Sequence, residues 1–209
     1  MNIISIASTK GGTGKSTLCA TLATHVQCIL GEKICLVDLD AGQGSAAAWA
    51  AMRERGRYPG PELIKVTRSL RADLRRLAAR GVAYTFVDSP PTLDDSGVVE
   101  AAVEIADHIL SPCRPSILDI GAAQTIAELA GDTPIGFVLM DVTTGPAWKA
   151  MNEEAAKALA DVGHVFKARL HHRPAYVNNM AIGQTGPETD RTASNEVAAL
   201  WQEVVAWMK

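Results

Sequence analysis

The sequence lacks several features that define large classes of protein. No apolar run is long enough to cross a lipid bilayer, so no transmembrane helix is predicted. The four cysteines form no C-x-x-C pair, and we interpret them as small buried residues in a reducing compartment rather than as a metal cluster or disulfide set. The net charge is only −3, so any binding to nucleic acid requires a local basic patch.

The chain also has no internal repeat and no low-complexity segment. Its 209 residues, 47% of them hydrophobic, suffice for one well-buried domain over residues 1–209. A glycine-rich loop begins about ten residues from the first methionine, so we expect neither a preceding DNA-reading domain nor a signal peptide. Strand patterns alternate with helical patterns throughout.

The glycine-rich loop, residues 8–17, is the most informative segment of the chain. An apolar strand pattern over residues 3–7 precedes it, and a helical pattern over residues 18–30 follows. Such a turn points several backbone N–H groups at one spot, where the helix dipole also favours negative charge. Lys15 can reach the outer phosphates and Ser16 can offer a hydroxyl to Mg²⁺. The loop predicts a nucleoside triphosphate site, and the flanking elements argue against a plain glycine turn with solvated lysines.

Two further strand patterns end in carboxylates. Residues 33–38 end at Asp38, with Asp40 close behind, and residues 82–88 end at Asp88. A carboxylate at the C-terminal end of a parallel strand faces the crevice in which ligands bind. Asp88 has the Walker B arrangement, in which the carboxylate holds Mg²⁺ through water. For Asp38 or Asp40 alone, capping of the next helix is the alternative.

The loop departs from the ordinary Walker A pattern, since Thr9 stands where that pattern has glycine and an extra lysine, Lys10, precedes the glycines. The form K-G-G-x-G-K-S resembles the deviant Walker A of the ParA/MinD ATPases. The D-x-P-P that begins at Asp88 is similar to the family, as is a proline-bearing segment matched by Pro112, Pro115, Leu118 and Asp119. The resemblance covers essentially the whole chain. It implies an α/β P-loop NTPase fold with a twisted, mainly parallel sheet and helices on both faces.

The resemblance also implies roles for individual residues. The expected nucleotide contacts are Lys10, Gly11, Gly12, Thr13, Gly14, Lys15, Ser16 and Thr17. The expected metal site comprises Ser16, Asp38 and Asp88, while Asp40 orients the attacking water. In the family the extra lysine, here Lys10, reaches across a dimer to the phosphates of the partner's nucleotide. Together with Lys15 and Asp40, it makes up the expected set of catalytic groups. The family's D-x-D-P-Q is altered, because residues 41–44 replace Pro-Gln, and a looser loop is expected.

The function that the resemblance implies is a weak ATPase with ATP and Mg²⁺ as cofactors. Met140-Asp141 is not the family's usual purine-contacting pair, so adenine is inferred from the family alone. ATP would favour a sandwich dimer that binds non-specific DNA, and a ParB-like or small adaptor protein would stimulate hydrolysis and release it. The chain length and the early position of the loop resemble those of small plasmid-type ParA proteins, or of carboxysome-positioning and conjugation-associated relatives. We expect a cytoplasmic protein that associates with the nucleoid when ATP is bound.

Two segments of the chain are rich in basic residues, and each allows a structural and a binding interpretation. A helical pattern with Arg68, Arg71, Arg75, Arg76 and Arg80 is interpreted as a solvated outer helix in preference to a phosphate-binding patch. Lys167, Arg169 and Arg173, in a strand and loop over residues 165–176, are candidate DNA contacts. Burial or pairing with carboxylates is an equal alternative for these three. The adjacent histidines 171 and 172 point to opposite sides of a strand, so zinc is not expected.

The last helical pattern, residues 192–209, bears on two alternative functions. MinD ends in a helix that inserts in membranes, and membrane-lying helices carry Lys and Arg on their polar face. Here that face carries Glu196 and Glu203, so we expect the helix to pack on the domain and no membrane binding. A MinD-like membrane-associated regulator and a P-loop enzyme acting on a small molecule stay as alternatives.

Overall fold

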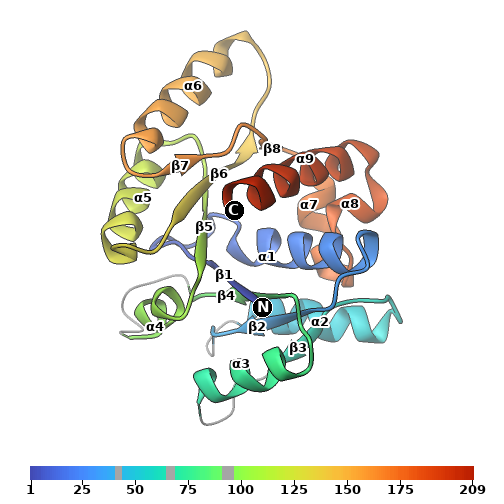
Figure 1. The fold of residues 1–209 in the computed structure, drawn as a ribbon. Coiled ribbons are helices and arrows are strands. Elements are labelled where there is room, and N and C mark those ends of the chain that lie inside the picture. Colours follow the sequence, from blue (N-terminus) through green and yellow to red (C-terminus); the bar gives the residue numbers. More distant parts are fainter. Residues whose placement is uncertain (41–43, 65–68, 91–96) are drawn as a thin grey trace.

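The computed structural model describes residues 1–40, 44–64, 69–90 and 97–209. Its centre is a parallel sheet with the strand order β3-β2-β4-β1-β5-β6-β7, in which β8 also pairs with β6 (Figure 1). The strands are β1 Asn2–Ile6, β2 Ile34–Asp38, β3 Glu62–Ile64, β4 Tyr84–Asp88, β5 His108–Cys113, β6 Ile135–Val142, β7 His164–Val165 and β8 Leu170–His171. Every recorded strand pair is parallel. The predicted fold class is confirmed, with the strand that feeds the glycine-rich loop at its centre.

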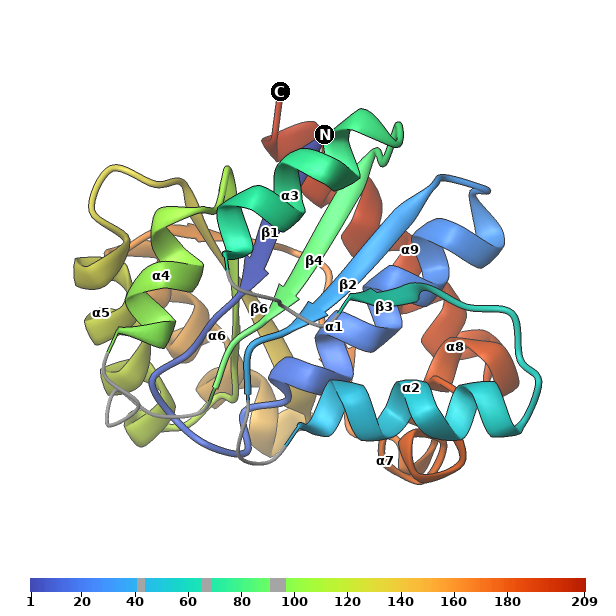
Figure 2. The same ribbon diagram turned by 90° about the horizontal axis from the view of Figure 1, so that it is seen from below.

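Helices cover both faces of the sheet (Figures 1 and 2). They are α1 Lys15–Thr24, α2 Ser45–Arg55, α3 Leu70–Ala79, α4 Val98–Glu104, α5 Ile117–Ala130, α6 Pro146–Ala160, α7 Pro174–Asn178, α8 Gly186–Thr189 and α9 Arg191–Trp207. A π-helical segment, η1 His25–Ile29, continues α1, and a 3-10 helix, η2 Met180–Ile182, follows α7. One face packs on α1, α2 and α9, and the opposite face packs on α3, α4, α5 and α6.

The burial of both faces of the sheet explains why the strand sequences are continuous apolar runs. Ile4 and Ile6 of β1 belong to the cluster with α1 and α9, while Ile109 of β5 belongs to the cluster with α4, α5 and α6. In β2, Leu36 joins the first cluster and Val37 joins a cluster on the opposite face. Successive side chains alternate between faces, and helices bury both faces, so each position favours an apolar residue.

The last helix packs on the domain, as expected. Val197, Leu200 and Val204 of α9 are fully buried. The ring of Trp201 makes an edge contact with Tyr84, with centroids 5.1 Å apart. Among the described residues, no helix combines the length and apolarity needed to cross a membrane.

Several boundaries differ from the expectation for local reasons. Residues 165–176 form the end of β7, then β8 and the start of α7, so the tyrosine at 176 lies in a helix and not in a loop. The dipeptide Gly186-Pro187 by itself predicts a turn. It is instead the start of α8, because Thr185 and Glu188 form a capping box around a proline in the first turn. The prediction of burial is wrong for Cys28, which lies exposed in η1, while the other three cysteines are buried.

Both chain ends lie near the amino-terminal edge of the sheet (Figure 2). Asn2 begins β1. Near the other end of the chain, the ring of Trp207 stacks on His164 of β7 and makes an edge contact with His108 of β5, with centroids 5.7 and 5.1 Å apart. The carboxyl ends of the strands, including Asp38 and Asp88, lie at the opposite edge.

Candidate nucleotide site

The glycine-rich loop connects β1 to α1, as predicted. Gly12 and Gly14 have φ values of 75° and 97°, in the left-handed region that favours glycine. A Cβ on Gly14 would also lie 3.0 Å from Cε of Met140, which packs beneath the loop. Gly14 is the N-cap of α1, and no side chain caps that end. The first-turn N–H groups, including those near Ser16, therefore suit an anion.

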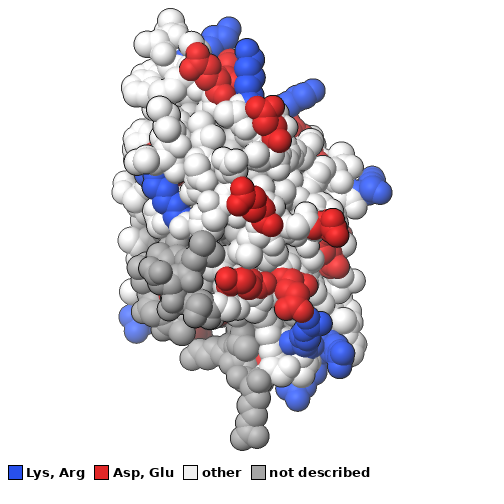
Figure 3. Space-filling model, turned by 90° about the vertical axis from the view of Figure 1, so that its left-hand side faces the viewer, with Lys and Arg blue, Asp and Glu red and all other residues white. Residues whose placement is uncertain are grey.

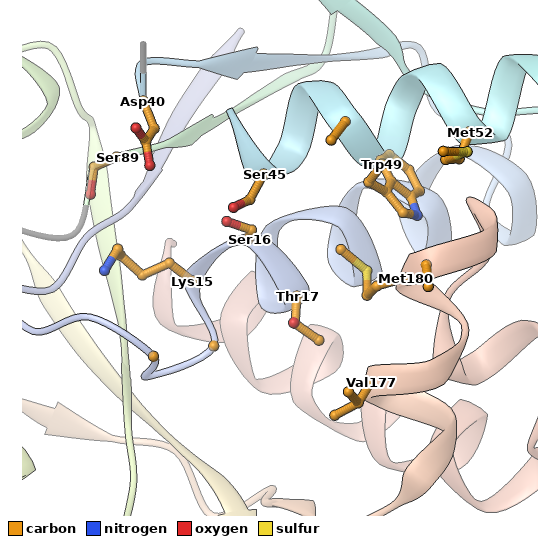
Figure 4. Close-up of a pocket in the computed structure, with 14 residues that line it drawn as sticks. Lys15, Ser16, Thr17, Asp40, Ser45, Trp49, Met52, Ser89, Val177 and Met180 are labelled. Atoms are coloured by element: carbon orange, nitrogen blue, oxygen red, sulfur yellow. The ribbon is translucent and has the colours of Figure 1, made fainter. Parts of the chain in front are cut away.

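Lys15 lies within this loop and is almost fully buried. Its Nζ donates to the carbonyl oxygen of Lys10 at 2.9 Å. Burial lowers the pKa of the Lys15 ammonium, while the carboxylates of Asp88 and Asp40 act in the opposite direction. Figure 4 shows the Lys15 side chain pointing toward the same part of the pocket as Asp40 and Ser89. The lysine thus supplies positive charge where the phosphates are expected.

Thr9 and Lys10, the two positions that depart from the ordinary Walker A pattern, both contact α5. Thr9 Oγ1 donates to the carbonyl oxygen of Ala122 at 3.1 Å. Lys10 Nζ forms an ion pair of 2.9 Å with Oδ1 of Asp119, whose side chain is only 3% exposed. Ser116 donates its hydroxyl to the other oxygen of Asp119. In this single chain, Lys10 therefore turns toward the start of α5 and does not line the pocket.

The two strand-end carboxylates are neighbours, because the register pairs Asp38 with Asp88. Asp38 Oδ2 accepts from the N–H of Ala47 at 2.8 Å, and Oδ1 accepts from the N–H of Asp40 at 2.9 Å. Burial raises the pKa of Asp38, and these two N–H groups oppose it. Asp38 therefore caps the first turn of α2, the alternative that the sequence left open.

Asp88 is 1% exposed, and neither carboxylate oxygen forms a hydrogen bond of ordinary geometry within the described chain. Burial raises its pKa to about 7, against the opposing effects of the Ser16 hydroxyl and the Lys15 ammonium. A buried carboxylate with unpartnered oxygens beside a serine hydroxyl fits a cation. The described residues include no group of three or more His, Cys, Asp or Glu suited to a metal.

A pocket of about 570 Å³ extends from the loop along α2 (Figure 4). Its polar half contains the loop residues, Asp40 and Ser89. The other half is apolar and lies between two walls. One wall consists of Ala48, Trp49 and Met52 of α2, and the other consists of Val177, Met180 and Ala181. Sequence reasoning missed this second half. Trp49 reads as an ordinary core residue of an alanine-rich helix, and only the fold brings residues 177–181 to it.

Two of the three candidate DNA contacts form ion pairs within the chain. Arg169 pairs with Glu153 at 3.0 Å, and Arg173 pairs with Glu196 at 2.6 Å. Lys167 is exposed. The two arginines therefore pair with carboxylates, which was the alternative interpretation of the sequence. A role in DNA binding stays a prediction for all three residues.

The arginines of α3, together with Arg80 at its C-cap, fit a solvated outer helix. Three of them form ion pairs, Arg71 with Glu104, Arg76 with Asp73 and Arg80 with Glu62. The face in Figure 3 shows Lys and Arg scattered among Asp and Glu. Arg68 lies outside the described residues, as do residues 41–43 of the altered loop and the second proline of D-x-P-P.

A comparison with known families shows which protein family the chain belongs to. A family model described as "CobQ/CobB/MinD/ParA nucleotide binding domain" matches residues 4–183. The chain belongs to this family. The ParA/MinD resemblance read from Lys10 and Lys15 is therefore confirmed, as is the assignment of the loop to a nucleotide-binding domain.

Known relatives of this ParA/MinD-family chain match it along almost its full length. "Maintenance of carboxysome distribution protein A" from Gloeobacter kilaueensis is 37% identical over 210 residues, which cover 97% of this chain and 93% of that protein. The MinD cell division protein of Aquifex aeolicus has a similar structure, with a TM-score of 0.76, 20% identity, and coverage of 99% and 98% of the two chains. An ATP complex of a Cyanothece McdA variant has a TM-score of 0.65 and 17% identity, and covers 96% of each chain.

Proposed function

We propose that this protein is an ATPase that positions a cargo through an ATP-dependent cycle of dimer formation and release. The observation that carries the proposal is that Lys15, Ser16 and Asp40 line one crevice, with the buried carboxylate of Asp88 beside Ser16 and Lys15. These are the groups that triphosphate hydrolysis requires. The relative from Gloeobacter kilaueensis, similar over nearly its whole length, is named for carboxysome distribution. That name favours cargo positioning as the purpose of the cycle.

In this proposal the chain's own residues orient the triphosphate and the water. The loop N–H groups and Lys15 hold the phosphates, and the buried position of Lys15 strengthens its attraction for them. Ser16 and Asp88 would hold Mg²⁺, which neutralises charge on the phosphate oxygens. Asp40, which lines the polar half of the pocket, orients the attacking water. Asp38 would lie near the water shell of the metal, and it also positions Asp40 and α2 by accepting from the backbone N–H groups of Asp40 and Ala47.

The dimer part of the proposal rests on Lys10 and the start of α5. Lys10 must leave Asp119 before it can reach the triphosphate of a second copy. Ile117 and Leu118, beside Asp119, are 88% and 75% exposed. Exposed apolar side chains next to the lysine suit an interface with a second copy that the nucleotide completes. Slow hydrolysis by a single copy follows, because its own site lacks the second ammonium group.

The release step involves DNA and a partner protein. The dimer would bind DNA without sequence preference through a local patch that includes Lys167. Arg169 and Arg173 would contribute if they left their carboxylate partners, Glu153 and Glu196, and paired with DNA phosphates. A ParB-like or small adaptor protein would then stimulate hydrolysis. Association with the nucleoid follows from the DNA-binding step. The apolar face of α9 is buried in the domain, so this face does not favour the membrane-bound alternative.

The test is to measure mass by light scattering with ATP and Mg²⁺, together with ATP turnover and DNA binding at two salt concentrations. We expect a dimer with ATP, a monomer with ADP, and DNA binding that weakens as salt rises. The Lys10→Ala protein should bind ATP as a monomer and lose turnover. Normal turnover by Lys10→Ala, or a monomer with ATP in the native protein, would reject the dimer cycle.

A further inference from the structure

A second pocket, here called the α6 pocket, lies where β6 leads into α6 (Figure 1). Its volume is about 360 Å³, and it is lined by residues 142–146, by Lys149 and Asn152 of α6, and by Arg169 and His171. It shares no lining residue with the pocket beside the glycine-rich loop. The α6 pocket is therefore separate from the nucleotide site.

The amino-terminal end of α6 borders this pocket, and no side chain caps it. The N-cap is Gly145, and Pro146 in the first turn has no N–H to donate. The N–H groups of Trp148 and Lys149 both bond to the carbonyl oxygen of Gly145, so the N–H of Ala147 is left for a ligand or water. In a helix of 15 residues, the dipole also favours negative charge at this end.

Two basic side chains line the same pocket. Lys149 is exposed, and it forms no ion pair within the part of the chain that the structure describes. Arg169 pairs with Glu153 through Nη2 at 3.0 Å. A guanidinium has five N–H donors, so this pair leaves others for a ligand. The two residues together can balance the charge of a doubly negative anion.

The α6 pocket also offers hydrogen-bond acceptors, which a bare anion cannot satisfy. Asn152 is 4% exposed, and its Nδ2 donates to the carbonyl oxygen of Thr143 at 3.1 Å. Its Oδ1 has no partner among the described residues. Nδ1 of His171 lies 2.7 Å from the carboxylate of Glu196, which also pairs with Arg173. Because that carboxylate only accepts, Nδ1 carries the proton and Nε2 of the neutral ring is a second acceptor. A fitting ligand therefore carries a donor as well as negative charge.

We propose that the α6 pocket binds the phosphate group of a small molecule. The N–H of Ala147 and the side chains of Lys149 and Arg169 hold the phosphate oxygens, while Asn152 accepts from a hydroxyl group. That hydroxyl belongs either to hydrogen phosphate itself or to a phosphorylated alcohol. A phosphate of the DNA backbone has one negative charge and no hydroxyl, so it matches the basic residues but not Asn152. This site goes beyond the proposed ATPase cycle and does not depend on it.

NMR of the ¹⁵N-labelled full chain tests the proposal, with ADP and Mg²⁺ present to occupy the glycine-rich loop. The probes are inorganic phosphate, sulfate, glycerol 3-phosphate and a DNA duplex without terminal phosphates. We expect phosphate to shift the amide signals of residues 143–149 in a saturable way. Sulfate should bind there at least about tenfold more weakly, because near pH 7.5 it has about the same charge but no hydroxyl for Asn152. Tighter binding of glycerol 3-phosphate than of phosphate would identify an organic phosphate as the ligand, and equal or weaker binding would identify inorganic phosphate.

Two variants separate the contributions of charge and of the acceptor. Lys149→Ala should weaken phosphate binding at least about tenfold, and Lys157→Ala, in the exposed last turn of the same helix, should leave it unchanged. Asn152→Leu removes the acceptor at a similar side-chain size, so phosphate should then bind as weakly as sulfate. If Asn152→Leu does not fold, Lys149→Ala and the comparison of phosphate with sulfate decide the matter.

Four results would overturn the inference. They are equal binding of phosphate and sulfate, unchanged phosphate binding in Lys149→Ala, shifts at residues 143–149 caused by the duplex and not by phosphate, and no shift there with any probe.

Discussion

Lys10 and Asp119 form an ion pair of 2.9 Å between the glycine-rich loop and the first turn of α5. The carboxylate is almost fully buried, while the lysine side chain is 36% exposed. The residue expected to act in the partner's site is thus held by its own chain. Pairing at this position therefore opposes the dimer that the proposed function requires.

Replacing Asp119 with asparagine should release Lys10. We expect Asp119→Asn to form the ATP-dependent dimer at a protein concentration at least about 30-fold lower, because a charge-assisted contact of about 1–2 kcal/mol in each of the two copies no longer has to break. Light scattering across a dilution series measures this. Asp132→Asn, an exposed position just beyond the end of α5, is the control. An unchanged dimerisation midpoint in Asp119→Asn would show that the ion pair does not restrain Lys10.

Replacing Asp88 with asparagine should remove the dependence of the site on Mg²⁺. Asp88 is buried with both oxygens unpartnered in the described structure, and an amide cannot supply the negative charge that a cation needs. We expect turnover to fall at least about 100-fold. ATP affinity measured with a chelator should stay close to that of the native protein. Asp161→Asn, an exposed change, is the control, and a variant with native turnover would remove Asp88 from the metal site.

Glu196 should stabilise the protein in a way that depends on pH. Burial acts to raise its pKa, but hydrogen bonds from Arg173 and His171 outweigh burial, and the pKa in the folded protein lies below the ordinary value. The stabilisation is therefore present above the ordinary pKa and is lost as pH falls through the folded value. We expect Glu196→Gln to lower the free energy of unfolding by about 2 kcal/mol at pH 7.

Urea titrations at several pH values measure this difference. The gap between Glu196→Gln and the native protein should narrow as pH falls from 5 toward 3, and Glu128→Gln, on the exposed face of α5, should show no gap at pH 7. A gap that is equally large at pH 3 would mean that the charge of Glu196 is not what stabilises the helix.

The cysteines should differ sharply in reactivity. Cys28 is exposed, whereas Cys35 and Cys113 are buried, and burial raises their pKa values to about 11 and about 12. Because the thiolate is the reactive form, we expect iodoacetamide at pH 8 to modify Cys28 first and the buried thiols only on unfolding. Mass spectrometry of a time course provides the measurement. Early modification of Cys35 would place its strand at the surface.

Much of the site could be predicted because its signals are local. The glycines, Lys15 and Ser16 lie within a few residues of one another, and the strand-end position of Asp88 follows from a short apolar run. Arg53, a buried residue of α2 next to the pocket residue Met52, could not be predicted in the same way. Its contact with Gly183 joins residues 130 positions apart, and within its own helix it resembles the exposed Arg55. Only the packing of α2 on the segment after α7 distinguishes the two arginines.

The same limit explains the boundaries that were missed. The start of α8 depends on Thr185 and Glu188 closing a capping box around Pro187, and the sequence also allowed a turn there. The capping role of Asp38 depends on where the first turn of α2 lies, and residues 41–43 separate the two. In both places a local pattern was compatible with two structures, and tertiary contacts chose between them.

The position of the two chain ends has a practical consequence. Because Asn2 and Trp207 lie at the edge of the sheet remote from the pocket, a fluorescent protein joined to either end would leave the ATP crevice and the start of α5 uncovered. Tagged molecules could then be followed inside living cells by microscopy, and a signal that moves across the cell would reveal the motion of the cargo-positioning cycle.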